Sequence, residues 1–254
     1  MDDGTSGGAD TVGEAVAFAR RFVALRYPEA RAALLAGSRA RGEAGPRSDY
    51  DVVLLFDSLP EGAWREKSVF EGRTFQFFGH DPGTLSYFCR VVAVQSAVPS
   101  VPEMVAEGIA LRGEGGAPLA AARALAARTL AAGPPPFRGA MLRGRIYALT
   151  ELVEILAEHP PGAAPIAIGG ALYPMLADFA LRTGGAWSAT IKRMPAALAE
   201  MDPALADRFA SAFAALFAAA DPAQVVALAD AILAPYGGRP RDSFRIASPP
   251  AWRD

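Results

Sequence analysis

The amino-acid sequence predicts an α+β protein, in which a small α/β domain with a mixed sheet precedes an all-α helical bundle. Three short apolar runs in the first half have the composition of buried strands, at residues 31–36, 51–56 and 73–79. From Pro118 onward, Ala-rich segments repeat their apolar residues at helical spacing. A Gly-rich break at residues 113–116 separates the two patterns and predicts the domain boundary.

The α/β domain is expected over residues 11–112. Residues 11–27 are predicted to form its first helix, because their apolar side chains recur at helical spacing and Pro28 ends the pattern. The elements between and after the strands are predicted from the same signals, in chain order a helical turn over 38–43, a loop over 44–48, and helices over 82–98 and 101–111.

The helical bundle is expected over residues 118–236. Pro- and Gly-containing breaks divide this region into six predicted helices, over residues 118–131, 138–158, 169–183, 187–199, 203–219 and 222–234. Two of the breaks contain Asp-Pro, which places an aspartate at an N-cap and a proline at the first helical position. Residues 1–10 are predicted to be a disordered tail, and residues 237–254 an irregular one.

Composition argues against several classes of protein. The 254 residues include one cysteine and two histidines, too few for a structural zinc site or a disulfide framework. A formal net charge of −2 argues against general nucleic-acid binding, which usually needs a basic surface. No uninterrupted apolar run reaches the roughly 18 residues needed to span a membrane, and the N-terminus has no signal-peptide pattern. We therefore expect a cytoplasmic protein with no membrane partner.

One segment, LLAGSRARGEAGPRSDYDVVLLF at residues 34–56, places several chemically useful groups between two apolar strands. Gly37 allows a sharp backbone turn, and Ser38 opens a helical turn whose free N–H groups can bind phosphate. Asp49 and Asp51 are two positions apart at the start of a strand, so their carboxylates are expected on one face. Two such carboxylates can hold a divalent cation, for which we predict Mg²⁺ with nucleotide phosphates completing the shell.

Each half of this motif has a simpler interpretation. A Gly-Ser pair alone is usually a turn, and an Asp-x-Asp alone is usually a solvated turn or a helix cap. The order of all the parts favours a binding site over an unrelated α/β protein with a chance motif. In the chance case, Asp49 and Asp51 would point away from each other or from Gly37.

The segment closely resembles the signature of the polymerase-β-like nucleotidyltransferase superfamily, which includes minimal and aminoglycoside nucleotidyltransferases. The positions that carry the resemblance are Gly37, Ser38, Arg41, Gly42, Ser48, Asp49 and Asp51. The resemblance implies a nucleoside triphosphate donor, two Mg²⁺ ions and transfer of a nucleoside monophosphate to an acceptor. It also implies that the two aspartates are catalytic metal ligands. The nucleotide-binding positions that it implies are Gly37, Ser38, Arg41 and Ser48.

The sequence departs from the family pattern at one position. The family usually has a third carboxylate on the next strand, and the best-matched position here is Gln76. An amide cannot act as a base and is a poor ligand for Mg²⁺. Either another acid serves as the base, or the protein binds nucleotide without turning it over.

Three further residues are candidates for contacts with the substrates. Glu154, which shares a helix face with Glu151, is a candidate general base, and a solvated acidic face is the alternative. Lys192, predicted to lie within a helix, is a candidate contact of the triphosphate, and a surface residue is the alternative. His80, at the end of the third strand, is a candidate substrate contact or a structural residue.

The favoured prediction is a nucleotidyltransferase that transfers a nucleoside monophosphate from Mg²⁺-bound nucleoside triphosphate to a small-molecule hydroxyl or a protein acceptor. The alternative is a catalytically weak or inactive nucleotide-binding protein, similar to regulatory antitoxin members of the superfamily, because Gln76 replaces the expected carboxylate. The sequence leaves open the nucleotide, the acceptor and whether the protein is a homodimer.

Overall fold

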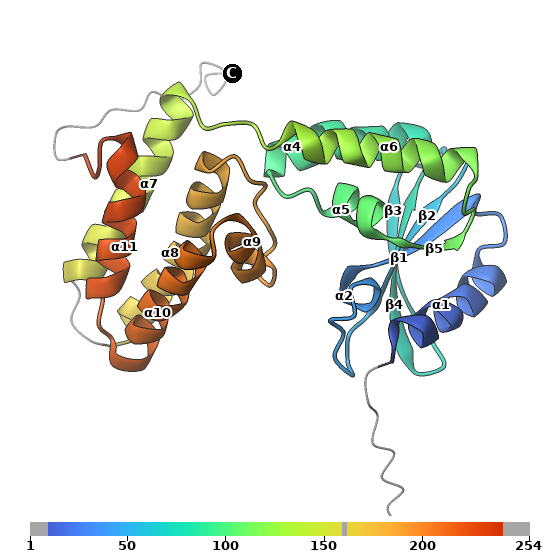
Figure 1. Cartoon of the computed structure of the whole chain (residues 1–254), viewed down its shortest axis with the longest axis horizontal. Coiled ribbons are helices and arrows are strands. Elements are labelled where there is room, and N and C mark those ends of the chain that lie inside the picture. The colour runs from blue at the N-terminus through green and yellow to red at the C-terminus, as the bar shows by residue number, and fades with distance from the viewer. Residues whose placement is uncertain (1–9, 159–161, 241–254) are drawn as a thin grey trace, which may run out of the picture. The chain divides into compact units, whose positions relative to one another are not determined.

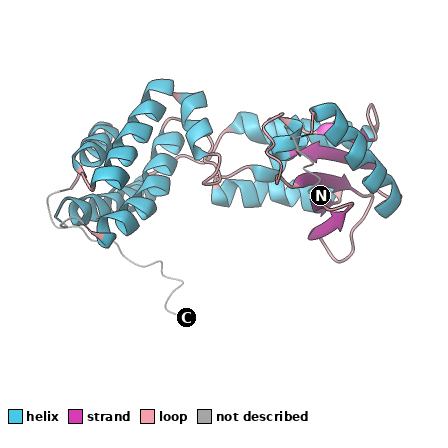
Figure 2. Cartoon of the chain, turned by 90° about the horizontal axis from the view of Figure 1, so that it is seen from below, coloured by secondary structure: helices cyan, strands magenta, loops and turns pink. Residues whose placement is uncertain are grey.

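The chain forms two structural units, with the boundary between Ala132 and Gly133. The computed structural model describes residues 10–158 and 162–240, and the first unit contains the whole sheet (Figure 1). The sheet is mixed, as predicted, and the second unit consists of helices (Figure 2).

Five strands form the sheet, in the spatial order β3-β4-β2-β1-β5. Their bounds are β1 Ala32–Ala36, β2 Tyr50–Leu55, β3 Trp64–Phe70, β4 Arg73–His80 and β5 Ile109–Arg112. Strands β2 and β4 are parallel, whereas the other neighbouring pairs are antiparallel. The three strands predicted from apolar runs are confirmed, with ends shifted by about one residue.

Strands β3 and β5 were not predicted. In β3, partly buried and exposed residues alternate, because it lies at the edge of the sheet. Its sequence WREKSVF is therefore too polar to read as an apolar run. The region 101–111, predicted to be one helix, consists of helix α5 (Ser100–Glu107) followed by the four residues of β5.

Helices cover both faces of the sheet (Figure 1). Helix α1 (Val12–Arg26) packs on one face, against a cluster that includes Tyr50, Phe75 and Phe77. On the other face lie α3 (Pro82–Tyr87), α5 and α6 (Ala117–Ala132), against a second cluster that includes Leu34, Val53 and Leu55. Alternate residues of β2 enter the two clusters, because successive side chains of a strand point to opposite faces.

Helix α6 belongs to the sheet-containing unit, although we expected the helical bundle to begin at residue 118. Its residues Leu119, Ala122 and Ala126 are buried in the same cluster as Leu34 of β1. The helix covers the sheet with these small and apolar side chains, so the structural boundary lies after it, at Ala132.

The predicted helix over residues 82–98 is interrupted. It consists of α3, a π-helical turn η1 (Phe88–Val92) and α4 (Ala93–Ser96). The π turn contains the buried Cys89, and burial raises the pKa of its thiol.

The described structure begins at Asp10, one residue earlier than the predicted start of the α/β domain at residue 11. Asp10, expected in a disordered tail, is described in the structure and forms ion pairs with Arg39 and Arg73. Thr11 then caps α1, where its hydroxyl accepts from the Glu14 backbone N–H. The rest of the predicted tails, residues 1–9 and 241–254, lies outside the described residues.

The second unit is built from five α-helices within its described residues. Their bounds are α7 Gly139–Glu158, α8 Ala163–Thr183, α9 Met194–Met201, α10 Pro203–Ala219 and α11 Ala223–Leu233. They share one core, whose members include Val153, Leu176, Phe179, Phe213 and Leu228. Asp202 caps α10 as predicted, and its Oδ1 accepts from the Leu205 N–H at 3.1 Å.

Among the described residues, helix α8 comes nearest to the length and composition of a membrane span. The helix continues through Pro165 and Pro174, and residues 164–183 are long and apolar enough to cross a membrane by length and composition alone. Its residues Leu172, Leu176 and Leu181 are fully buried in the core of the second unit. This packing accounts for the apolar composition of the helix.

We expect acid to destabilise the first unit through His80. This side chain is 2% exposed, and burial lowers its pKa to about 4. In the unfolded chain a histidine takes up its proton near pH 6.5, so protonation favours unfolding as the pH falls from 6.5 toward 4. Above pH 6.5 His80 is neutral in both states and does not lower the free energy of unfolding. Between pH 7.5 and pH 5 its protonation in the unfolded chain lowers this free energy by about 2 kcal/mol.

Urea unfolding at both pH values measures this loss. The variant His80→Gln has no titrating group at this position, so its free energy of unfolding should fall by about 2 kcal/mol less over the same interval. The carboxylates titrate in both proteins and cancel in the comparison. Equal losses in the wild type and the variant would contradict the assignment.

Candidate functional site

The site begins where β1 ends, at a glycine that brings the backbone against an aspartate. Gly37 follows β1 and opens the short helix α2 (Gly37–Ala40) with a φ of +68°. The strand register pairs Ala36 with Asp51 of β2. A Cβ atom on Gly37 would lie 2.3 Å from Oδ2 of Asp51. The Asp51 carboxylate therefore lies directly against the Gly-Ser turn, and only glycine leaves room for it.

Asp49 directly precedes β2 and is hydrogen-bonded to a residue of the neighbouring strand β4. Gln76 lies beside Asp51 in the parallel register of β2 and β4. Its Nε2 donates a hydrogen bond to Oδ2 of Asp49 at 2.9 Å. Gly37, Asp49, Asp51 and Gln76 are thus brought together at one end of β2, which argues against a chance motif.

Arg65 of β3 completes this group, and sequence reasoning missed it. Its Nε and Nη2 both donate to Oε1 of Gln76, at 3.0 and 2.5 Å. These bonds orient the Gln76 amide: its oxygen accepts from the Arg65 guanidinium, and its NH₂ donates to Asp49. The available signal was the alternation of residues 64–70, which places Arg65 and Lys67 on the exposed side of an edge strand.

A second missed residue, Arg39, fixes the loop that leads to Asp49. The Arg39 side chain is buried, and its Nε and Nη2 donate to the backbone oxygen of Ser48 at 3.0 and 2.6 Å. Its Nη1 donates to Oδ2 of Asp10 at 3.0 Å, and its guanidinium lies 4.0 Å from the centre of the Tyr50 ring. A buried charge with all these partners is well compensated, so it can hold the end of the loop in place.

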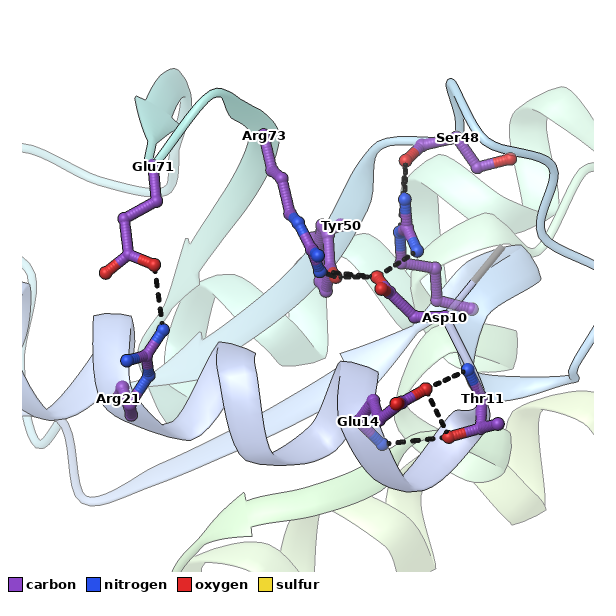
Figure 3. Close-up of polar contacts among 9 residues, drawn as sticks. Asp10, Thr11, Glu14, Arg21, Ser48, Tyr50, Glu71 and Arg73 are labelled. Atoms are coloured by element: carbon purple, nitrogen blue, oxygen red, sulfur yellow. Dashed lines mark hydrogen bonds and ion pairs between the residues drawn. The ribbon is translucent and has the colours of Figure 1, made fainter. Parts of the chain in front are cut away.

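Asp10 is the residue that joins the other members of this partly buried network (Figure 3). Besides Arg39, its carboxylate accepts from the Tyr50 hydroxyl and from Arg73, which also donates to the Tyr50 oxygen at 2.7 Å. Burial and the hydrogen bond to Asp10 raise the pKa of the Tyr50 hydroxyl. The network therefore anchors both ends of the segment that carries Asp49, at Ser48 and at Tyr50.

Three predicted nucleotide-binding residues, Ser38, Ser48 and Arg41, make polar contacts within the protein. Ser38 is partly buried in α2, and its backbone oxygen accepts from the Glu43 N–H at 2.9 Å. The Ser48 hydroxyl accepts from the Gly45 N–H at 3.0 Å and closes the loop. Arg41 forms ion pairs with Glu43 at 2.8 Å and with Glu107 at 3.5 Å. Its charge is therefore partly compensated within the protein.

Three other candidates do not join this group within the first unit. Glu154 on α7 and Lys192 in the turn before α9 both belong to the second unit. Both side chains are exposed. The prediction that Lys192 lies within a helix is wrong, because residues 191–193 form a turn. His80 pairs with Leu55 at the opposite end of β4, about 13 Å along the strand from Gln76.

The oxygen donors at this end of β2 fit one hard cation. Asp49 and Asp51 can supply two carboxylate ligands, and Mg²⁺ commonly takes its remaining ligands from phosphates and water. Among the residues that the structure describes, no three His, Cys, Asp or Glu side chains are grouped to hold a metal. Gln76 has an amide in place of the third carboxylate that a second ion would need, and its amide oxygen already accepts from Arg65.

A comparison with known protein families matches the segment that contains this group. Residues 19–78, which include all four grouped residues, match the family model of the nucleotidyltransferase domain. The chain is also similar to a crystal structure of a nucleotidyltransferase-like protein from Exiguobacterium sibiricum 255-15, with 11% sequence identity and a TM-score of 0.32. The similarity covers 85% of this chain and 70% of that one. No functionally curated protein matches. Residues 19–78 are thus similar to the nucleotidyltransferase domain, the family that the Gly-Ser and Asp-x-Asp motifs of this segment resemble.

Proposed function

We propose that the protein transfers a nucleoside monophosphate from a nucleoside triphosphate to an acceptor, with release of pyrophosphate. The observation that carries this proposal is the contact between the Asp51 carboxylate and Gly37, inside the segment that matches the nucleotidyltransferase domain. It joins a candidate metal ligand to a candidate phosphate-binding turn. A nucleotide bound across both would place its α-phosphate next to the carboxylates.

The roles of the residues follow from their chemistry. The backbone at Gly37 and Ser38 would bind the triphosphate, and Asp49 and Asp51 would hold Mg²⁺. When bound, the ion would neutralise charge on the phosphates and on the departing pyrophosphate. Arg39 would keep the loop before Asp49 in place, so the carboxylate would be ready for the ion before the substrate arrives.

Lys192 and Glu154 remain candidates for two further roles, from the chemistry of their side chains. In this proposal Lys192 contacts the triphosphate as a point charge, and Glu154 is a candidate base for an acceptor that carries a hydroxyl. The exposure of both side chains leaves them accessible to a ligand. Unchanged turnover in the variant Glu154→Gln would remove the base assignment.

Calorimetry with each of ATP, GTP, CTP and UTP, with and without Mg²⁺, tests nucleotide binding by the full chain. We expect at least one of them to bind, and to bind more tightly when Mg²⁺ is present, because the ion links its phosphates to Asp49 and Asp51. A pyrophosphate-release assay with the same nucleotides then tests turnover. The absence of binding to all four nucleotides would refute the proposal.

A second candidate function is nucleotide binding without transfer. The hydrogen bonds of Gln76 to both Asp49 and Arg65 favour it, because an amide fills the place where the family usually has a third carboxylate. Such a protein would regulate a partner through its nucleotide-bound state. Nucleotide binding without pyrophosphate release across a broad panel of acceptors would support this alternative.

A further inference from the structure

The edge strand β3 carries two exposed cations next to Gln76. Lys67 of β3 lies directly opposite Gln76, and Gln76 lies beside Asp51, so the three side chains form a row across three strands on one face. Arg65 donates two hydrogen bonds to the Gln76 amide oxygen and lies 5.0 Å from the centre of the Phe78 ring. We call Arg65 and Lys67 the β3 cation pair.

The two side chains of the β3 cation pair are available to a ligand. Within residues 10–158 and 162–240, neither side chain forms a salt bridge, and both are exposed. Arg21, by contrast, pairs with Glu71, and Arg31 pairs with Asp57. The pair thus offers an unmatched positive charge beside the carboxylates, which suits an anionic ligand.

The groups around Gln76 are unsuited to a hydroxyl acceptor. A hydroxyl must lose its proton during attack on the α-phosphate, which requires a base within hydrogen-bond reach. Gln76 is not a base, and its NH₂ already donates to Asp49.

The same groups suit an acceptor that is already an anion. A carboxylate or a phosphate is deprotonated at neutral pH and needs no base. It must instead approach an anionic triphosphate, which requires positive charge at the acceptor position. A guanidinium presents parallel N–H donors that match the oxygens of either group, and an ammonium adds a point charge.

We propose that the acceptor attacks through an oxyanion, a carboxylate or a phosphate, held by Arg65 and Lys67 beside Gln76. This inference rests on the proposed nucleotidyl transfer. A lone pair of the oxyanion forms the new bond to the α-phosphorus, and the bond from that phosphorus to the bridging oxygen of the β-phosphate breaks. The bonding pair leaves with pyrophosphate, and no proton is transferred. The product is a mixed anhydride of the acceptor and the nucleoside monophosphate, and this revises the expectation of a hydroxyl acceptor.

The first test measures anion binding in the absence of nucleotide. Methyl phosphate and acetate, titrated separately into the full chain at low ionic strength, should shift the backbone amide resonances of β3 and β4. The variants Arg65→Gln and Lys67→Gln should each weaken the binding by about fivefold, as expected for exposed charges. Arg31→Gln is the matched control, because this arginine pairs with Asp57 away from Gln76 and should leave binding unchanged. Unchanged binding in both β3 variants would overturn the proposal.

The second test compares acceptors. Pyrophosphate release should be stimulated by carboxylates or phosphates and not by the corresponding alcohols. Release of bound product by hydroxylamine would identify a carboxylate as the acceptor, and resistance to hydroxylamine a phosphate. Stimulation by alcohols alone would overturn the proposal. If no nucleoside triphosphate binds, the proposed function fails, and the anion titration still decides whether the β3 cation pair is an oxyanion site.

Discussion

Replacing Asp51 by asparagine should lower the rate of pyrophosphate release by about 10²- to 10³-fold. The substitution keeps the size of the side chain but removes the negative charge that would hold Mg²⁺ next to Gly37. A bound ion contributes several kcal/mol of charge stabilisation in the transition state, and each 1.4 kcal/mol corresponds to about tenfold in rate. The Mg²⁺-dependent part of nucleotide affinity should be lost together with the activity.

Asp57→Asn is the matched control for this substitution. Asp57 follows the other end of β2, is exposed and pairs only with the exposed Arg31 in the described part of the chain. Its replacement removes the same charge and should leave activity within about twofold, since exposed ion pairs contribute little. A variant Asp51→Asn with wild-type activity would exclude a role for this carboxylate in metal binding.

Replacing Gly37 by alanine should weaken the binding of Mg²⁺-nucleotide by at least about tenfold. The new Cβ would lie 2.3 Å from Oδ2 of Asp51, so either the carboxylate or the turn must move. A shift of this kind separates the two halves of the candidate site. The positive φ of 68° adds a stability cost of about 1–2 kcal/mol, because side chains with a Cβ are strained in this conformation.

The variant Gly72→Ala separates these two effects. Gly72 has a similar φ of +75°, but a Cβ there would meet no atom within 4 Å. Gly72→Ala should lose only the stability that the positive φ costs in urea unfolding, whereas Gly37→Ala should lose nucleotide affinity in calorimetry as well. Equal nucleotide affinity in the two variants would show that the approach of Asp51 to Gly37 is unimportant for binding.

The sequence predicted the elements whose signals are local. Strands β1, β2 and β4 are buried, so each appears as a short apolar run, and proline or glycine marks most of the helix ends. Strand β3 was missed because its edge position allows charged residues on alternate sites. Helix α6 was assigned to the wrong unit because its sequence shows that it is a helix and not which surface it covers.

In the candidate site, too, some contacts follow from local spacing in the sequence and others do not. Gly37, Asp49 and Asp51 lie close together in the sequence, and their spacing around a turn and a strand is enough to predict that they meet. Arg39 and Asp10 are 29 positions apart, and Arg65 meets Gln76 only because β3 folds back on β4. No local pattern could show these contacts. Glu154 was proposed from its helical spacing to Glu151, and Lys192 from its charge, and neither signal says which groups surround the residue in the fold.

By itself, the sequence determined that this chain has a Gly-Ser turn and an Asp-x-Asp strand with the spacing of a nucleotidyltransferase motif, and that a glutamine stands where a third carboxylate is usual. Only the tertiary structure decided what surrounds that glutamine. Strand pairing places Arg65 and Lys67 beside it, and these residues come from an edge strand whose own sequence carries little signal. The physical reason is that a strand's neighbours are chosen by hydrogen bonding and burial across the whole sheet, whereas a motif reports only the geometry of its own few residues.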